Sequence, residues 1–372
     1  MNPFVVGAAC CFPSGPRIEL ADAAVRSALN QFRHHPSYRD RCGFPVQVSR
    51  FPDDDLSALQ RGQDLLRAVI HELATQLDSR RLLAPAAHAW LVLPARSSRP
   101  GIPDDPVEPL TDVVRRGWPN DGVEGVAVVR GGHASGMVAL QQARAYLEAE
   151  PGRLALVFGV ESMLSGEALM WLECQRLLHG THSPSHGSAR TNPYGRVPGE
   201  GAAAVALTHR LPDGEKSAWA SLPGVGVADE HRTYASGEPC TGVGLTRAAH
   251  AALSQCGRDM AGQVGTVVLD LNDEPYRADQ FGFTALRLAR YLAPGWRRVV
   301  PPLASGDLHA ASAIAHVALA AHALHQRRSH AHCLVLSSSD DALRGAAVLG
   351  AIDPHPALPE IRAWRSPSTS MA

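Results

Sequence analysis

The 372-residue sequence predicts an α/β fold built from two related halves with parallel sheets. Apolar, strand-like runs alternate with helix-like stretches, which is the order of βαβ units with right-handed crossovers. The order also repeats: a glycine turn, an alanine-rich helix and an apolar strand occupy residues 132–163 and again residues 306–339. The glycines that open these segments lie 174 residues apart and the strands 178 apart. Near-equal offsets of this kind indicate an internal duplication.

Hydrophobic patterning predicts the other elements in chain order. An uninterrupted apolar run predicts a buried strand at residues 4–12, and residues 22–32 are helix-like. Apolar residues recur at helical spacing over residues 56–77, which predicts an amphipathic helix. In the second half we expect a helix over residues 283–292 and an extended run over residues 299–303.

The boundaries between the halves follow from composition. A polar stretch at residues 209–217 reads as a linker, so we place the N-terminal half at residues 1–208 and the C-terminal half at residues 218–352. Residues 353–372 contain several prolines and are expected to form a loosely ordered tail. Helices that carry alanine on every face are expected between two sheets, because small side chains allow close approach.

Composition excludes several classes of function. The net charge is −1 and the charged fraction 19%, which gives no electrostatic footprint for nucleic acid or an anionic membrane. Seven scattered cysteines without a CxxC pair predict neither a disulfide framework nor a cysteine zinc site and favour a reduced, cytoplasmic setting. No apolar stretch is long enough for a membrane span. No phosphate-binding or dinucleotide fingerprint occurs, so we expect no cofactor and no metal.

Four segments in order resemble the thiolases and β-ketoacyl synthases. These are GHASGMVAL at residues 132–140, LALVFGVESM at 154–163, PGEGAA at 198–203 and GDLHAA at 306–311. The similarity spans residues 4–350. It implies a thiolase-like fold with layered αβαβα architecture, and a dimer formed at the strand before the nucleophile helix, here residues 126–129.

This sequence departs from the family at each catalytic position. The resemblance implies a cysteine nucleophile where His133 stands, and a cysteine thiolate is what a helix N-terminus stabilises. The run that should hold the first catalytic histidine contains Asn272 and Asp273 instead, and Asp307 stands in place of the second. We therefore predict no catalytic residue at these degenerate positions.

Neighbouring polar residues leave alternatives open. Ser135 could be a substitute nucleophile, but an N-cap serine is the favoured interpretation because residues i and i+2 of a helix do not face each other. The acidic cluster of Asp270, Asp273 and Glu274 could serve acid–base or metal chemistry, although solvated charges or an ion pair with Arg277 are favoured. A candidate residual pocket comprises His133, Ser135, Asp307 and His309.

Two further segments, residues 40–45 and 270–278, resemble the 3-oxoacyl-carrier-protein synthase-like proteins found beside bacterial type VI secretion genes. That resemblance implies a catalytically degenerate accessory protein that binds a sister subunit, an adaptor or a secretion effector. The resemblance also implies that this protein forms a homodimer, or a heterodimer with a related thiolase-like chain. Two alternatives stay open: an acyltransferase or 3-oxoacyl-carrier-protein synthase with relocated catalytic residues, and a regulatory subunit like the chain length factors.

We expect no condensing activity, because all three groups of the Cys-His-His constellation are replaced. Acyl-thioesters should leave no covalent acyl adduct on the chain, as measured by intact-protein mass spectrometry. His133→Cys alone should not restore turnover, because both histidines would still be absent. An acyl adduct on a cysteine, abolished by one Cys→Ser change, would contradict this expectation.

Overall fold

A computed structural model describes residues 2–52, 56–83, 86–95, 106–119, 122–180, 192–211, 218–257, 259–329 and 331–352. Its largest sheet has ten strands in the order β10-β9-β11-β12-β8-β1-β7-β6-β4-β5. Five of these strands come from the N-terminal half: β1 (Phe4–Cys11), β4 (Ala87–Pro94), β5 (Val123–Gly131), β6 (Leu154–Ser162) and β7 (Glu200–Thr208). The other five are β8 (Ala220–Asp229), β9 (Val264–Leu269), β10 (Leu292–Val299), β11 (His332–Ser338) and β12 (Leu343–Gly350).

The two sets of five strands have the same topology. In the order β1-β7-β6-β4-β5, two antiparallel pairs are followed by two parallel pairs. The order β8-β12-β11-β9-β10 has the same directions. The sets meet only where β1 pairs with β8, at Phe4–Ser221 and Val5–Ala220. The duplication predicted from the glycine turns is thus present in the strand order.

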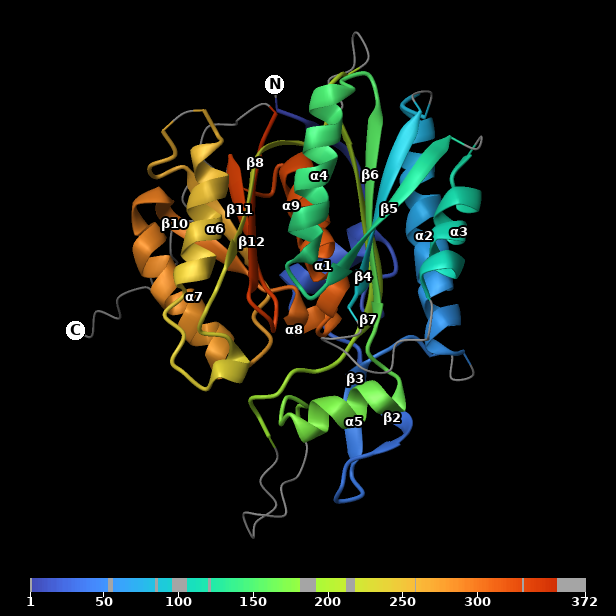
Figure 1. The fold of residues 1–372 in the computed structure, drawn as a ribbon, viewed down its shortest axis with the longest axis vertical. Coiled ribbons are helices and arrows are strands. Elements are labelled where there is room, and N and C mark those ends of the chain that lie inside the picture. Colours follow the sequence, from blue (N-terminus) through green and yellow to red (C-terminus); the bar gives the residue numbers. More distant parts are fainter. Residues whose placement is uncertain are drawn as a thin grey trace, which may run out of the picture.

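Helices form three layers around the two sets of strands (Figure 1). The outer layer over the first set holds α2 (Ala58–Asp78) and α3 (Val107–Gly117), and that over the second set holds α6 (Val243–Ser254) and α7 (Pro275–Leu288). Between the sets lie α4 (Ser135–Ala149) and α9 (Ser312–His325), whose side chains share one core with both. The layered αβαβα architecture predicted from the sequence is confirmed.

The two central helices, α4 and α9, are packed closely because they are rich in small residues. Twelve of the fourteen residues of α9 are buried. A Cβ added to Gly136 of α4 would lie 2.8 Å from the Cβ of Ala313 in α9, so the two helices cross in close contact. Small residues at this crossing allow one helix layer to contact a sheet on each side.

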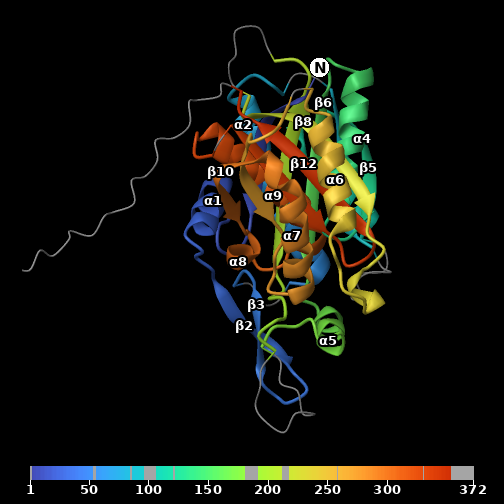
Figure 2. The same cartoon turned by 90° about the vertical axis from the view of Figure 1, so that its left-hand side faces the viewer.

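A smaller unit extends beyond the layers in both views (Figures 1 and 2). It consists of the hairpin β2 (Phe32–Arg39) and β3 (Pro45–Ser49) together with α5 (Gly166–Cys174), around a small apolar core of its own. The remaining short elements are α1 (Ile18–Arg26), α8 (Pro302–Ser305), η3 (Tyr234–Ser236), η4 (Ala289–Tyr291) and η5 (His309–Ala311).

Three predicted elements differ from the structure. The helix expected over residues 22–32 is α1, which ends at Arg26 before strand β2 begins. The helix expected over residues 283–292 is α7, which starts earlier because Pro275 occupies its first turn, where proline is favoured. The extended run expected at residues 299–303 is instead the end of β10 followed by α8, because Pro302 stands at the start of a helix, where proline is favoured.

Two segments predicted from the sequence, the linker and the C-terminal tail, are described only in part or not at all. The expected tail at residues 353–372 and residues 212–217 of the linker lie outside the described residues. In the part of the chain that is described, no helix has both the length and the apolar character needed to cross a membrane.

We predict that Gly226→Ala destabilises the protein by about 1–3 kcal/mol, because the new Cβ overpacks the β8–α6 contact. It would lie 2.2 Å from the carbonyl oxygen of Ala248. The matched control is Gly282→Ala in α7, where nothing lies within 4 Å. That change should stabilise the helix by up to about 1 kcal/mol. Urea unfolding midpoints measure both, and equal effects of the two changes would contradict the predicted close packing.

Candidate functional site

The three positions at which the sequence departs from the family come together in space. His133 lies in the turn between β5 and α4, and Asp307 lies in the turn between α8 and η5. His133 Nε2 is 2.8 Å from Asp307 Oδ1, and both side chains are 1% exposed. The Nδ2 of Asn272, which follows β9, donates to Asp307 Oδ2 at 2.6 Å. Asp307 is therefore the acceptor that joins these positions.

Two buried arginines surround this centre with ion pairs. Arg196 contacts Glu274 at 2.6 Å and Asp340 at 2.9 Å, and its Nη1 is 3.6 Å from Asp307. Both Arg196 and Glu274 are nearly inaccessible to solvent, at 1% and 4%. Because guanidinium groups offer several donors in a rigid plane, one arginine can hold carboxylates from three different turns.

Arg277, on the first turn of α7, extends the network. It donates to Asp270 at 2.9 Å, to Glu274 at 2.8 Å and to Asp340 at 2.9 Å. Its Nη2 also lies 3.3 Å from His133 Nδ1. We define the arginine network as these two arginines and their four carboxylate partners: Arg196, Arg277, Asp270, Glu274, Asp307 and Asp340.

The charges in the network hold its acids ionised. Burial alone would raise the pKa of Asp307, but His133 and Arg196 outweigh burial and hold that pKa well below its usual range. The same balance, with Arg196 as the strongest favourable partner, lowers the pKa of Asp340. Burial opposes charge on Arg196 as well, yet the neighbouring carboxylates raise its pKa. At neutral pH these groups are therefore charged and depend on one another.

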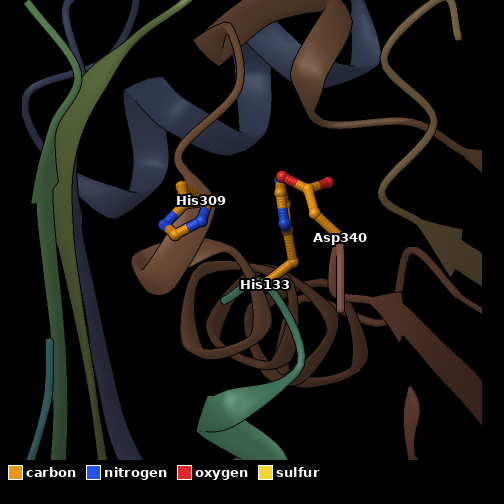
Figure 3. A group of neighbouring side chains, drawn as sticks. All are labelled: His133, His309 and Asp340. Atoms are coloured by element: carbon orange, nitrogen blue, oxygen red, sulfur yellow. The ribbon is translucent and has the colours of Figure 1, made fainter. Parts of the chain in front are cut away.

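His309 adds a second histidine–carboxylate pair beside the first. Its Nδ1 is 3.1 Å from Glu161 Oε2, and both side chains are fully buried. The rings of His309 and His133 meet edge to face with centroids 4.9 Å apart, and Asp340 faces His133 from the other side (Figure 3). His309 also has a positive φ of 39°, a strained conformation for a residue other than glycine.

Two residues chosen from the sequence behave differently from expectation. The interpretation of Ser135 as an N-cap is wrong: Ala134 is the N-cap residue of α4. The Ser135 Oγ is buried with no hydrogen-bond partner among the described residues. Asp273 is exposed with a φ of 70° and takes no part in the arginine network. Its neighbours Asp270 and Glu274 form the ion pair with Arg277 that was one of the sequence alternatives.

Three residues of the site were not found by sequence reasoning. Arg196 precedes the PGEG segment, Asp340 follows β11, and Glu161 lies near the end of β6. The one available signal was position, because polar residues at the ends of buried strands often gather at one edge of a sheet. Their partners come from other turns, so pairing required the fold.

Three buried thiols, those of Cys10, Cys11 and Cys333, are poor candidates for a nucleophile. Burial, followed by nearby acids, raises the pKa of Cys11 to about 12, and burial raises that of Cys333 to about 11. The pKa of Cys10 is raised in the same way. These thiols are neutral at physiological pH, and neutral thiols are poor nucleophiles.

We predict that Asp307→Ala costs about 3–5 kcal/mol of stability at pH 7, because it leaves a buried guanidinium and imidazole without their carboxylate. The matched control is Asp273→Asn, because Asp273 is also an aspartate next to Asn272 in the chain but is exposed and lies outside the arginine network. Asparagine tolerates positive φ, so this change should stay within about 0.5 kcal/mol. Chemical denaturation with fluorescence detection measures both. A cost below about 1 kcal/mol for Asp307→Ala would contradict a network centred on this carboxylate.

Comparison with known proteins agrees with this geometry. Residues 122–212, which include His133, match the family model of the beta-ketoacyl synthase N-terminal domain. No curated protein matches the sequence.

Solved structures match almost the whole chain. The ishigamide ketosynthase/chain length factor is 19% identical with a TM-score of 0.67, and the match covers 95% of this chain and 100% of that one. The ketosynthase ApeO in complex with its chain length factor ApeC from Xenorhabdus doucetiae is 13% identical with a TM-score of 0.67 over 94% and 98% of the two chains. The type II polyketide synthase complex AntDE:AntF is 13% identical with a TM-score of 0.75 over 94% and 99%. The solved structures show that the chain has the thiolase-like fold of the β-ketoacyl synthases, and the family model matches its residues 122–212.

Proposed function

We propose that the chain is a non-catalytic, ketosynthase-like accessory subunit that pairs with a second thiolase-like chain. The observation that carries this proposal is the state of His133 at the position of the family's nucleophile. Its imidazole is 1% exposed, bonded to Asp307 and in contact with Arg277. A side chain held in this way serves to connect the two halves of the protein.

Covalent acyl transfer needs a nucleophile, a base beside it and a path for the substrate. His133 lacks the path, because it is buried together with Met137 of α4, which is 0% exposed. Ser135 lies within the same helix turn and is 1% exposed. Neither side chain is accessible to a carrier-bound acyl group in this conformation, which supports a structural role for the former active-site region.

The two edges of the ten-stranded arrangement differ, and the difference favours pairing through β5. The central residues of β5 are apolar, contact the core on both faces and are each only partly buried: Val126, Ala127, Val128 and Val129. The opposite edge strand, β10, exposes residues that discourage strand pairing: Pro294, Gly295, Arg297 and Arg298. An apolar edge strand without such protection is a surface for a partner strand.

A related chain is the partner that fits this edge best. Strand pairing at an edge satisfies backbone donors and acceptors of both chains, and a partner of the same fold presents the same edge. Among the similar solved structures, the ketosynthase ApeO is in complex with its chain length factor. By analogy we place this chain as one member of such a pair, in the reducing cytoplasm, as a homodimer or a heterodimer. A role in type VI secretion would rest on a further effector or adaptor bound to that pair.

We predict that the purified chain, alone or co-expressed with a related thiolase-like chain from its host, has about twice the 39.6 kDa mass of one copy. Size exclusion with light scattering measures the mass. Val128→Asp on β5 should convert the pair to monomers, because a buried unpaired carboxylate at the interface is costly. The control Arg298→Asp, on β10, should leave the pair intact.

Two results would count against the proposal. One is a monomer at micromolar concentration both alone and with the related chain. The other is a covalent acyl-enzyme formed with an acyl-thioester, which would favour the alternative of an enzyme with relocated residues. If pull-down from the native host yields a secretion effector or adaptor together with the pair, the accessory role extends to secretion.

A further inference from the structure

Each of the two histidines of the site, His133 and His309, has one ring nitrogen within hydrogen-bond distance of a carboxylate. His133 Nε2 pairs with Asp307 and His309 Nδ1 pairs with Glu161. A metal ion binds the neutral form of the ring. In that form the nitrogen that donates to the carboxylate carries the single proton. This assigns a lone pair to His133 Nδ1 and to His309 Nε2. Histidines that bind metals have this arrangement, with a carboxylate fixing the tautomer from the far side of the ring.

The site contains polar atoms that lack a partner. His309 Nε2 is fully buried and has no hydrogen-bond partner among the described residues, and the same holds for Asn272 Oδ1. An unsatisfied buried acceptor costs about 1–3 kcal/mol. Both atoms are acceptors when the His309 ring is neutral, so the group that satisfies them is a cation or a hydrogen-bond donor.

The geometry points to a site for one borderline divalent metal ion, such as Zn²⁺, bound by His133, His309 and Asp340. One ligand atom from each of the three lies within 4.8 Å of the other two (Figure 3). The centre of such a triangle is about 2.8 Å from each atom, whereas zinc–nitrogen and zinc–oxygen bonds are about 2.0–2.2 Å. Binding therefore draws each ligand inward by about 0.7 Å, through small side-chain rotations.

Charge in the arginine network favours this occupant. Its four carboxylates share two guanidinium groups through ion pairs, which leaves two negative charges in a buried space. A divalent ion neutralises that excess. Arg277 Nη2 is a competing cation, at 3.3 Å from His133 Nδ1 and 2.9 Å from Asp340 Oδ1, and it must withdraw from both when the metal binds. Arg196 also donates to both oxygens of Asp340, so one of these two bonds must give way to the metal. The arginine keeps its bonds to Asp270 and Glu274 through Nη1 and Nε.

The position of the site suggests what the ion does and how it enters. The Asp340 side chain is 21% exposed, so this residue provides contact with solvent. His133 belongs to the first half of the chain, whereas His309 and Asp340 belong to the second. The ion therefore cross-links the two halves at the centre of the molecule, in addition to the hydrogen bond between His133 and Asp307.

The test titrates Co²⁺ into the full chain after dialysis against a chelator. We expect one equivalent per chain, with visible d–d absorption from nitrogen and oxygen ligands, and competition by Zn²⁺. His309→Gln should weaken binding by more than about 100-fold, and Glu161→Gln, which leaves all three ligands in place, by about 10–100-fold. Circular dichroism and thermal unfolding of each variant verify that it folds.

The matched control is His322→Gln. His322, on α9, is also buried and also has an unpartnered ring nitrogen, but its ring packs against Trp219, and among the described residues it belongs to no group of three possible metal ligands. Co²⁺ binding should be unchanged in this variant. The proposal is overturned if the wild-type chain shows no saturable Co²⁺ spectrum. It is equally overturned if folded His309→Gln and Glu161→Gln bind as the wild type does, or if His322→Gln loses binding as they do.

Discussion

The contact between His133 and Asp307 is the constraint on which the centre of this molecule depends. Each residue follows the glycine that opens the central helix segment of its half, and the two lie 174 positions apart in the chain. The pseudo-equivalent turns therefore face each other, and a hydrogen bond of 2.8 Å joins them. Because Asp307 is ionised inside the protein, it needs Asn272 and Arg196 as well as the imidazole. Charge on one buried acid thus explains why four separate turns converge.

A network of this kind changes what the family's pocket can do. In a catalytic site, groups that react are left partly free and accessible to substrate. Here the corresponding side chains are bound to one another, and the guanidinium of Arg277 lies against the imidazole of His133. The ion pairs of Arg196 join the first half of the chain to two carboxylates of the second. A rigid core of this type suits a subunit whose function lies at its edges.

The edges then carry the differences between the two halves. Duplication gives β5 and β10 equivalent places, yet residues 126–129 at the centre of β5 are apolar, while β10 carries Pro294 and two exposed arginines. Proline and charge protect an edge strand from pairing, whereas partly buried valines invite it. The buried centre keeps the halves in a fixed orientation, so an interface on β5 would be presented by a rigid body. A metal ion between His133, His309 and Asp340 would strengthen that connection in the same place.

The sequence by itself determined the fold and part of the site. Glycine turns, alanine-rich helices and apolar strands at near-equal offsets fixed the duplication, because these patterns arise from local packing needs. Family motifs also located His133, Asn272 and Asp307. Tertiary structure alone decided that Arg196, Glu161 and Asp340 join them, since each lies at the end of an element whose partner is remote in the chain. Ser135 lost its expected capping role for the same reason: burial of α4 under the second half placed Ala134 at the cap and the hydroxyl in the core. Long-range ion pairs leave no periodic trace in a sequence, so only the fold could assign them.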